Sequence, residues 1–364
     1  MSSFRKIKDF VIYCEEQYHS AMPSVVKLDD GEILVAFRRA PDRRILGKKQ
    51  ITHIDSNSNL MLVRSRDNAE TWSKVPELLC AHPWGGSQDP CLFQLNDGSI
   101  LCTSYSWIEA ESNYAKNDRR MIRIGNHLSG GGFLLRSNDG GHNWSAPEAA
   151  PRLQHNQAHD HLGNSLPVFN RGTMAQDEHG RIYWGVTRHN CMHPARGSIE
   201  LLVSDDGGRS WVHLSTIAED TKVSFNECSL YFTEGGDLCC FIRSFGIDDH
   251  TVLARSKDKG KTFQPWIDAG WPGNPHHALR LQDDRVLLVY GYRRDPIGIR
   301  ARILEPECND IKQAQEFIIR DDGGSWDVGY PWSILLDNGS VLVVYYFNID
   351  DGTRFIAGSV LRIT

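Results

Sequence analysis

The segment SDDGGRSW, residues 204–211, carries the strongest fold signal, because its spacing of residue types returns along the chain. The pattern Ser-x-Asp-x-Gly-x-x-aromatic is repeated in SNDGGHNW from Ser137 and SKDKGKTF from Ser256, and in SRDNAETW from Ser65 with Ala69 in place of Gly. In a tight β-hairpin the Asp carboxylate accepts backbone N–H bonds and Gly supplies a positive φ, while the aromatic ring packs under the turn. We interpret the four copies as such hairpins, and DDGGSW from Asp321 as a shortened fifth copy.

A second pattern, an acidic residue or Asn beside Gly followed by an apolar run, alternates with the first. Each copy follows another apolar run, as expected of two strands joined by a short turn. A spacing of roughly 50–80 residues suits four-stranded propeller blades with variable loops. The sequence therefore predicts an all-β, six-bladed β-propeller formed as one domain by residues 1–364. The six copies are DDGEILVAF from Asp29, NDGSILCTSY from Asn96, EHGRIYWGV from Glu178, EGGDLCCFI from Glu234, DDRVLLVYGY from Asp283 and DNGSVLVVYYF from Asp337.

Two apolar runs lie at opposite ends of the chain and have no obvious hairpin partner of their own. They are FVIYCEE near the N-terminus and RFIAGSVLRIT at the C-terminus. A propeller leaves only short, protected sheet edges when its ends are joined in one sheet. We expect these two runs to share a blade and close the ring.

The composition limits the choice of partners and compartment. The 364 residues include 40 Lys and Arg against 46 Asp and Glu, a net charge of −6. No basic surface is therefore expected for nucleic acid, and no apolar run reaches the roughly 18–20 residues that span a membrane. MSSFRKIKDF lacks the apolar core of a signal peptide, so we expect a cytoplasmic location unless a leader was removed. Nine cysteines without a CxxC motif are expected to be mostly buried free thiols.

The Ser-x-Asp-x-Gly-x-x-Trp pattern resembles the Asp box of the sialidase (neuraminidase) superfamily, and the resemblance extends over essentially the whole chain. Members of that family are six-bladed propellers. Their site holds three arginines that bind a carboxylate, a Tyr nucleophile assisted by a Glu, and an Asp that acts as acid and base. The resemblance implies a carbohydrate substrate and neither a metal nor another cofactor, and it leaves the oligomeric state open.

Two segments resemble the parts of the family that carry the nucleophile. NECSLYFTEGGDLCCFIRS places Glu227 before one strand and Arg243 at the end of the next, where the family has its Glu and its second arginine. DVGYPWSILLDNGS places Tyr330 where the family has its nucleophilic Tyr. A Tyr with an ordinary pKa of about 10 is a poor nucleophile, so a base such as Glu227 is required.

The third arginine of the family has several candidates in this chain. PIGIRARIL places Arg300 just before a strand, which is the best match, and Arg302 on the same strand face competes with it. Arg293 and Arg294 in GYRRDP are further candidates.

The chain departs from the family pattern in two places. Ala21 in HSAMPSVVKL occupies the position of the first arginine, so that only Arg38 or Arg39 in VAFRRAP could replace it. The loop ILGKKQITHIDSNSN offers Asp55 for the acid/base role, and His53 as an alternative that needs less pKa tuning near neutral pH.

Histidines gather in the expected loops. His155, His159 and His161 in HNQAHDHLGN have a spacing compatible with a metal site, but they lack a helix or a Cys partner, and we interpret them as a polar loop. Four more side chains at strand ends are expected to contact the substrate: His276, His277, Arg188 and His189.

These features favour a sialidase-like exo-glycosidase that retains anomeric configuration through a covalent Tyr intermediate. Since two well-placed arginines remain, the expected sugar is acidic: a uronic acid, an ulosonic acid or a sulfated sugar. Two alternatives use the same propeller. One is a lyase directed at uronates, in which His and Tyr move protons while arginines neutralise the carboxylate. The other is a carbohydrate-binding propeller without catalysis.

Overall fold

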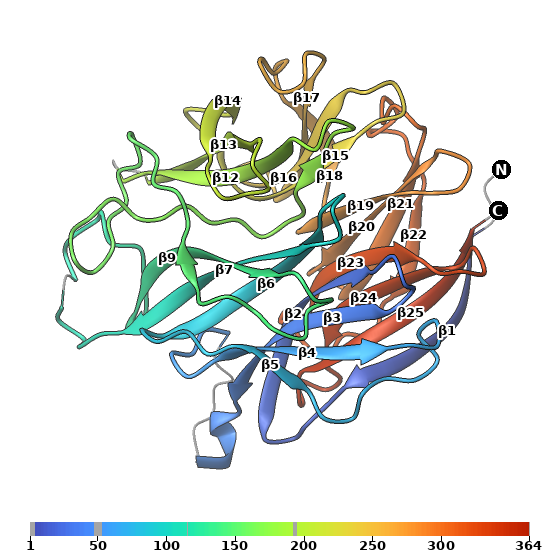
Figure 1. Cartoon of the computed structure of the whole chain (residues 1–364), viewed down its shortest axis with the longest axis horizontal. Coiled ribbons are helices and arrows are strands. Elements are labelled where there is room, and N and C mark those ends of the chain that lie inside the picture. The colour runs from blue at the N-terminus through green and yellow to red at the C-terminus, as the bar shows by residue number, and fades with distance from the viewer. Residues whose placement is uncertain (1–3, 47–52, 115, 192–194, 364) are drawn as a thin grey trace.

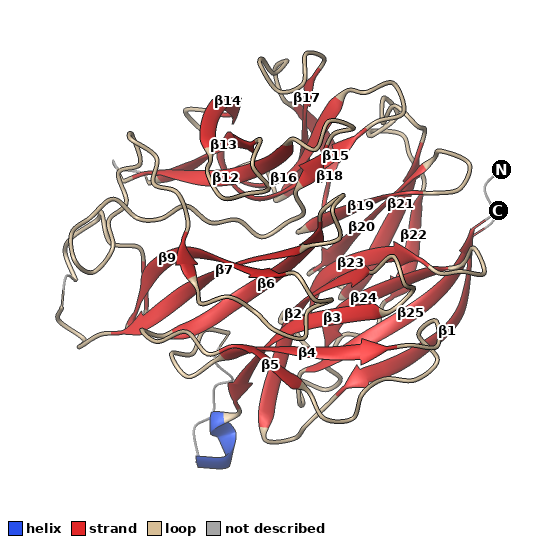
Figure 2. Ribbon diagram, in the orientation of Figure 1, coloured by secondary structure: helices blue, strands red, loops and turns tan. Residues whose placement is uncertain are grey.

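The structure is a computed structural model that describes residues 4–46, 53–114, 116–191 and 195–363. Its regular structure consists of β-strands and one short 3-10 helix, η1 (Arg43–Leu46) (Figure 2). The strands form six separate sheets around a common centre (Figure 1). The fold is therefore the six-bladed β-propeller that the repeated hairpins predict.

The first three blades follow one another along the chain, each an antiparallel meander. The first contains β2 (Tyr18–Lys27), β3 (Ile33–Pro41), β4 (Asn59–Ser65) and β5 (Glu77–Cys80). The second contains β6 (Gly86–Gln94), β7 (Ile100–Glu109), β9 (His127–Ser137) and β10 (Glu148–Ala149), with β8 (Arg123–Ile124) paired to β9. The third contains β11 (Ala175–Gln176), β12 (Ile182–Asn190), β13 (Arg196–Ser204) and β14 (Val212–Ala218).

The other three blades complete the circle, and the first strands of neighbouring blades pack together at the centre, as β2 does against β6 and β23. The fourth blade contains β15 (Ser224–Phe232), β16 (Leu238–Phe245), β17 (His250–Ser256) and β18 (Ile267–Pro272). The fifth contains β19 (His276–Arg280), β20 (Val286–Tyr292), β21 (Gly298–Leu304) and β22 (Glu316–Arg320). The sixth contains β23 (Gly329–Leu335), β24 (Val341–Phe347), β25 (Phe355–Ile363) and β1 (Phe4–Tyr13).

The sixth blade is built from both ends of the chain. β1 pairs antiparallel with β25, in a register that runs from Phe4 opposite Ile363 to Tyr13 opposite Ile356 (Figure 1). Backbone hydrogen bonds between the ends of the chain hold the last blade beside the first. Unfolding of one blade therefore exposes apolar surface on its neighbours, which favours a cooperative ring.

The Asp-box segments connect the third and fourth strands of the first four blades. In the third blade Gly208 N donates to Ser204 Oγ at 2.8 Å, and Asp206 Oδ1 accepts from Ser210 N at 2.9 Å. The Trp211 indole donates to Gly208 O at 3.1 Å, which holds the ring beneath the turn. DDGGSW from Asp321 is different: it lies between β22 and β23, so its interpretation as a fifth hairpin is wrong.

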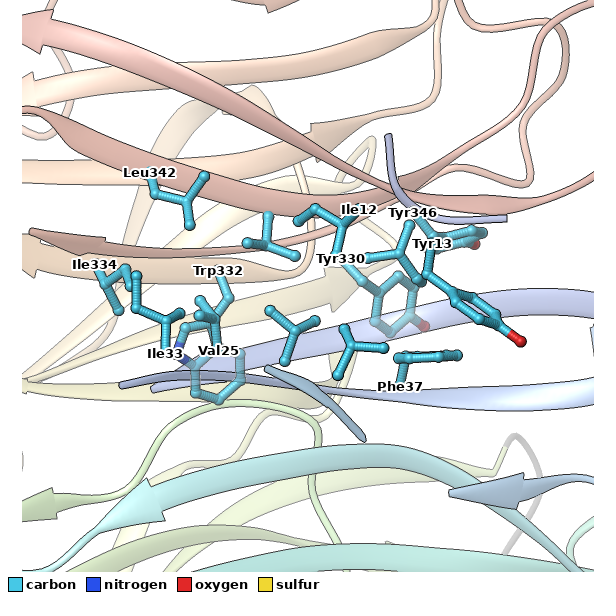
Figure 3. Close-up of a cluster of buried hydrophobic side chains, with 14 of the residues drawn as sticks. Ile12, Tyr13, Val25, Ile33, Phe37, Tyr330, Trp332, Ile334, Leu342 and Tyr346 are labelled. Atoms are coloured by element: carbon cyan, nitrogen blue, oxygen red, sulfur yellow. The ribbon is translucent and has the colours of Figure 1, made fainter. Parts of the chain in front are cut away.

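The apolar core is divided into clusters between blades. Figure 3 shows the cluster between the first and last blades, where Val25 and Ile33 face Trp332 and Leu342. All of these side chains are buried, and full burial of a large apolar side chain contributes about 1.5–3 kcal/mol. Tyr330 belongs to the same cluster, so the rigid core fixes the position of a candidate catalytic side chain.

The nine cysteines are free thiols, of which Cys14 is exposed and Cys191 is partly exposed, while the other seven are buried. In the part of the chain that the structure describes, no helix has the length and apolar character to cross a membrane.

Candidate active site

Four of the six inner strands share a backbone irregularity near the centre of the ring. The ladder shifts register there, for example between Asn226 and Cys228 of β15. Each irregularity contains one residue other than glycine with positive φ, which costs roughly 1–2 kcal/mol and persists where the surroundings hold it. Such bulges re-aim side chains. The four residues are Met22 (φ 55°), Asp89 (φ 47°), Glu227 (φ 45°) and Tyr330 (φ 53°).

Two consecutive buried residues satisfy the backbone groups that these bulges leave open. The Asn170 side chain donates to Cys228 O at 2.7 Å and accepts from Cys228 N at 2.9 Å. Arg171 Nη2 donates to Pro23 O at 2.6 Å and to Tyr330 O at 3.1 Å. One segment of the connection between the second and third blades thus fixes the bulges of three other blades, and with them Glu227 and Tyr330.

Asn170→Ala tests this role. The substitution leaves the buried N–H and C=O of Cys228 without a partner, which we expect to lower the free energy of unfolding by about 1–3 kcal/mol. The exposed Asn164→Ala in the same connection is the control. Thermal unfolding of the two variants measures the difference, and equal melting temperatures would show that Asn170 does not support the bulge.

The bulged strands surround a central cavity of about 290 Å³. Its lining includes the polar side chains of Glu227, Arg243 and Tyr330 and the rings of Tyr105 and Phe169, which stack at 4.5 Å. The remaining lining residues are His53, Ile54, Gln88, Asp89, Trp107, Ile122, Ile124, Asn170, Arg171, Thr187, His189, Asn226 and Phe245. Polar groups and aromatic rings in one concave site are typical of a small-molecule pocket.

Tyr330, Glu227 and Arg243 form a connected group in this cavity. Tyr330 Oη donates to Glu227 Oε1 at 2.8 Å, and Arg243 Nη1 donates to Glu227 Oε2 at 2.8 Å. Although burial opposes it, the positive charges of Arg243 and Arg293 hold the pKa of Glu227 below its usual value. Burial and the charges of Glu227 and Asp89 raise the pKa of Tyr330 well above its usual value. The resting pair is therefore a neutral phenol beside a carboxylate.

Arg293, which follows β20, provides a second positive charge on the Tyr330 side. Its guanidinium lies 5.3 Å from the centre of the Tyr330 ring, and Nε donates to Val328 O at 3.2 Å. Nη2 is buried and has no hydrogen-bond partner among the described residues. Although Arg293 is not among the residues that line the cavity, its buried, unpaired donor beside Tyr330 is suited to an anionic group of a ligand.

Asp89 places a second carboxyl group in the cavity. Tyr105 Oη donates to Asp89 Oδ2 at 2.8 Å, and burial raises the pKa of Asp89 to about 6. Asp89 Oδ1, Gln88 Oε1 and Asn226 Oδ1 are buried and accept no hydrogen bond from the described residues. These acceptors can receive hydrogen bonds from ligand hydroxyl groups. No sequence pattern indicated that Asp89, Gln88 or Asn226 belongs to the site.

The structure separates the two candidates for the acid/base role. His53 lines the cavity, and its Nδ1 lies 2.8 Å from Asp327 Oδ1. Asp55 does not line it: the carboxylate is 2% exposed and binds Arg43 at 2.7 and 3.0 Å. Although burial opposes it, the hydrogen bond from Arg43 lowers the pKa of Asp55.

Arg300, the best sequence match for the third arginine, lies outside the cavity lining on β21. Its guanidinium donates to Arg320 O at 2.5 Å and to Pro296 O at 2.8 Å, so its donors serve the backbone of its own blade. Arg302 likewise lies against Trp271, at 4.4 Å from the ring centre. Of the four sequence candidates, Arg293 is the one beside Tyr330.

Neither Arg38 nor Arg39 lines the cavity. Arg38 lies opposite Ala21 in the β2–β3 ladder and is completely buried, with Nη1 at 3.3 Å from His19 Nδ1, and burial lowers its pKa. Arg39 points away, donating to Glu15 at 2.6 Å. Neither side chain therefore takes the place of the first arginine, and the arginine that lines the cavity beside β2 is Arg171, whose Nη2 donates to Pro23 O at 2.6 Å.

Of the remaining predicted contacts, His189 lines the cavity, where burial lowers its pKa to about 4. His276 and His277 lie outside its lining, because each is buried against side chains of the core: His276 bonds Thr251 at 2.8 Å and His277 stacks on Trp332 at 4.7 Å. Burial lowers both pKa values to about 3.

Arg188 also lies outside the cavity lining, since its guanidinium pairs with Glu200 at 2.7 Å and Glu219 at 2.9 Å. Across the described residues, no three His, Cys, Asp or Glu side chains form a group able to hold a metal ion, and this includes the loop with His155, His159 and His161.

The fold and the central cavity define a class, the sialidase-like propellers. The chain belongs to the family described as "BNR repeat-like domain", whose model matches residues 88–343. It is a divergent member of the sialidase-like superfamily.

Three solved structures illustrate the relationship. A protein of unknown function from Dyadobacter fermentans is 48% identical, with a TM-score of 0.96 and 99% coverage of each chain. The Hadza microbial sialidase Hz136 is 13% identical, with a TM-score of 0.66 over 94% of this chain and 65% of that one. The NanB sialidase of Streptococcus pneumoniae is 12% identical, with a TM-score of 0.65 over 97% and 70%. No curated protein matches the chain.

Proposed function

We propose that this protein is a glycoside hydrolase that removes a terminal acidic sugar with retention of configuration, using Tyr330 as the nucleophile. The observation that carries the proposal is the contact of 2.8 Å between Tyr330 Oη and Glu227 Oε1 beside Arg243 and Arg293. The sialidase folds of the structural neighbours support the same class of reaction.

In the first step, Tyr330 Oη attacks the anomeric carbon while its proton passes to Glu227. The aglycone oxygen departs with a proton from an acid in the site. In the second step, water attacks the anomeric carbon on the same face, and the Tyr330 oxygen leaves and recovers its proton from Glu227. Two inversions give net retention.

A neutral nucleophile suits a sugar that carries a negative charge near its anomeric carbon, because a carboxylate nucleophile would be repelled. Arg243 and Arg293 supply the attraction for that charge, and the unpaired acceptors of Gln88 and Asp89 face the hydroxyl groups. Without a cation at Ala21, the proposed class is a sugar with a carboxylate or sulfate, such as a uronic acid or an ulosonic acid.

The test is hydrolysis of aryl glycosides by the purified protein. The panel contains an α-sialoside, other ulosonides, uronides and sulfated hexosides, with the matching neutral hexosides as controls. We expect turnover of at least one acidic member, with NMR showing that the first-formed sugar retains its configuration. Absorbance of an unsaturated uronate would instead support the lyase, and binding by calorimetry without any product would support a carbohydrate-binding protein. Either result would overturn the hydrolase proposal.

A further inference from the structure

We infer that His53, held by Asp327, is the acid and base of this site, and that Asp55 is a structural residue of the same loop. This inference rests on the proposed hydrolase and adds a positioning residue, Asp327, to it. In the family pattern a carboxyl group from this loop fills the role, so the assignment replaces a carboxylic acid by an imidazole.

Asp327 is held in place by several hydrogen-bond partners. Its carboxylate is 4% exposed and accepts from Tyr346 Oη at 2.9 Å and Arg354 Nε at 3.1 Å, in addition to the contact with His53. His19 Nε2 also lies at 3.0 Å from Oδ2. Although burial opposes it, these partners hold the pKa of Asp327 well below its usual value. A fixed carboxylate of this kind orients one imidazole nitrogen and defines its tautomer.

The His53 ring is oriented with one nitrogen at Asp327 and the other on the opposite edge of the ring. Because Nδ1 is occupied by Asp327, Nε2 on the opposite edge is the nitrogen available to a ligand. The ring lies beside Trp326, with centroids 5.6 Å apart, and its centroid is 6.5 Å from that of Tyr330. Gln88 Nε2 donates to His53 O at 3.1 Å, which fixes the backbone. The side chain is 27% exposed at the cavity, so solvent and leaving group can both reach it.

Asp55, the other candidate of this loop, has a carboxylate that is already bound within the loop. Both of its carboxylate oxygens are bound by Arg43, and Oδ1 also accepts from Asn57 N at 2.8 Å. A carboxylate that is buried, paired with arginine and outside the cavity lining cannot readily exchange a proton with a substrate. Its contacts close the turn of residues 55–58, which follows His53.

The proposed proton transfers balance over the two steps. As the bond from the anomeric carbon to the aglycone oxygen breaks, protonated His53 gives its Nε2 proton to that oxygen and becomes neutral. Water then donates a proton to Nε2 while its oxygen bonds to the anomeric carbon, and the Tyr330 oxygen is released. The charged and titratable groups that act on His53 are Asp327, His19 and Asp89.

Leaving-group dependence tests the assignment on the acidic glycoside that the protein hydrolyses. His53→Asn should lower kcat/KM by about 10²–10⁴-fold for an alkyl or sugar leaving group and leave that for a dinitrophenyl group nearly unchanged, because dinitrophenolate departs without a proton. It should also remove the limb of the pH–rate profile that reports the acid. Asp327→Asn should show the same pattern, with partial recovery in Asp327→Glu. Asp55→Asn should keep the parent's leaving-group dependence and pH profile.

A measurement on the free protein makes the test independent of turnover. Long-range ¹H–¹⁵N spectra, assigned by the signal that His53→Asn removes, should show neutral His53 protonated at Nδ1, the nitrogen that faces Asp327. Protonation of neutral His53 at Nε2 would overturn the inference. So would an increased leaving-group dependence in Asp55→Asn together with an unchanged one in His53→Asn. If the parent protein hydrolyses no member of the panel, the proposed function fails, and this result is distinct from either outcome.

Discussion

Tyr330→Phe is expected to abolish turnover, with a loss in kcat on the order of 10⁴-fold or more, since removal of a catalytic nucleophile has effects of this size. The substitution deletes the oxygen that bonds the anomeric carbon and leaves the ring in its core cluster. Binding of the acidic sugar should persist, because Arg243 and Arg293 remain. Stopped assays with the aryl glycoside measure the first effect, and calorimetry measures the second.

Tyr345→Phe is the matched control for this experiment. Tyr345 is buried in the same blade, and its substitution removes a comparable hydroxyl contact, the 2.7 Å bond to Ser359, outside the cavity lining. It should keep its activity and show any stability loss that a buried Tyr→Phe change causes. Appreciable residual activity in Tyr330→Phe would mean that Tyr330 orients Glu227 and is not the nucleophile.

The sequence was sufficient to predict the propeller because the fold is specified by local turn chemistry. Each Asp box requires Ser, Asp and a small residue at fixed spacing. The aromatic residue, three positions after the small residue, packs under the turn. Ala69 shows the tolerance of this rule: it adopts φ 68° where the other copies have glycine, and its N–H still reaches Ser65 Oγ at 3.0 Å. Fold information of this kind can be recognised in a single sequence.

The site was only partly predictable, because its geometry depends on bulges and on contacts between blades. Glu227, Arg243 and Tyr330 were predicted because the segments that contain them resemble the family's site segments. Nothing local to Asp89 indicates that its strand bulges toward the centre, since positive φ is unusual for Asp within a strand. Asn170 acts on a strand that lies 58 positions further along the chain, and such a pairing has no local sequence signal.

Arg300 and Asp327 show that the place of a residue in a sequence pattern can also mislead. The sequence pattern predicts that Arg300 lies just before a strand, but Arg300 lies within β21 and pairs with Tyr290 of β20, in the interior of its blade. Asp327 follows DDGGSW, which sequence alone groups with the Asp boxes. Its role becomes visible only when His19, His53 and Arg354 converge on it from three other segments.

Arg293→Met is expected to weaken binding of the acidic sugar about 30-fold or more, measured by calorimetry in the Tyr330→Phe background so that no turnover interferes. The size follows from the loss of roughly 2 kcal/mol or more when a buried charge pair with a ligand is broken. The Glu227–Arg243 contact remains intact, so the effect reports the charge of Arg293 itself. Arg293→Lys should recover part of the affinity, because it restores the charge without the planar donor group.

The neighbouring Arg294→Met provides the control, since Arg294 forms an exposed pair with Asp248 at 2.8 Å and should not affect binding. The neutral counterpart of the sugar should bind both variants with the affinity of Tyr330→Phe alone. Equal losses for the acidic and neutral sugars would mean that Arg293 shapes the pocket and does not bind the anion. In that case the substrate charge would be left to Arg243 and Arg171, the arginines of the cavity lining, each of which already binds other groups, and a sugar with a single weakly bound anionic group, or none, would become the better substrate class.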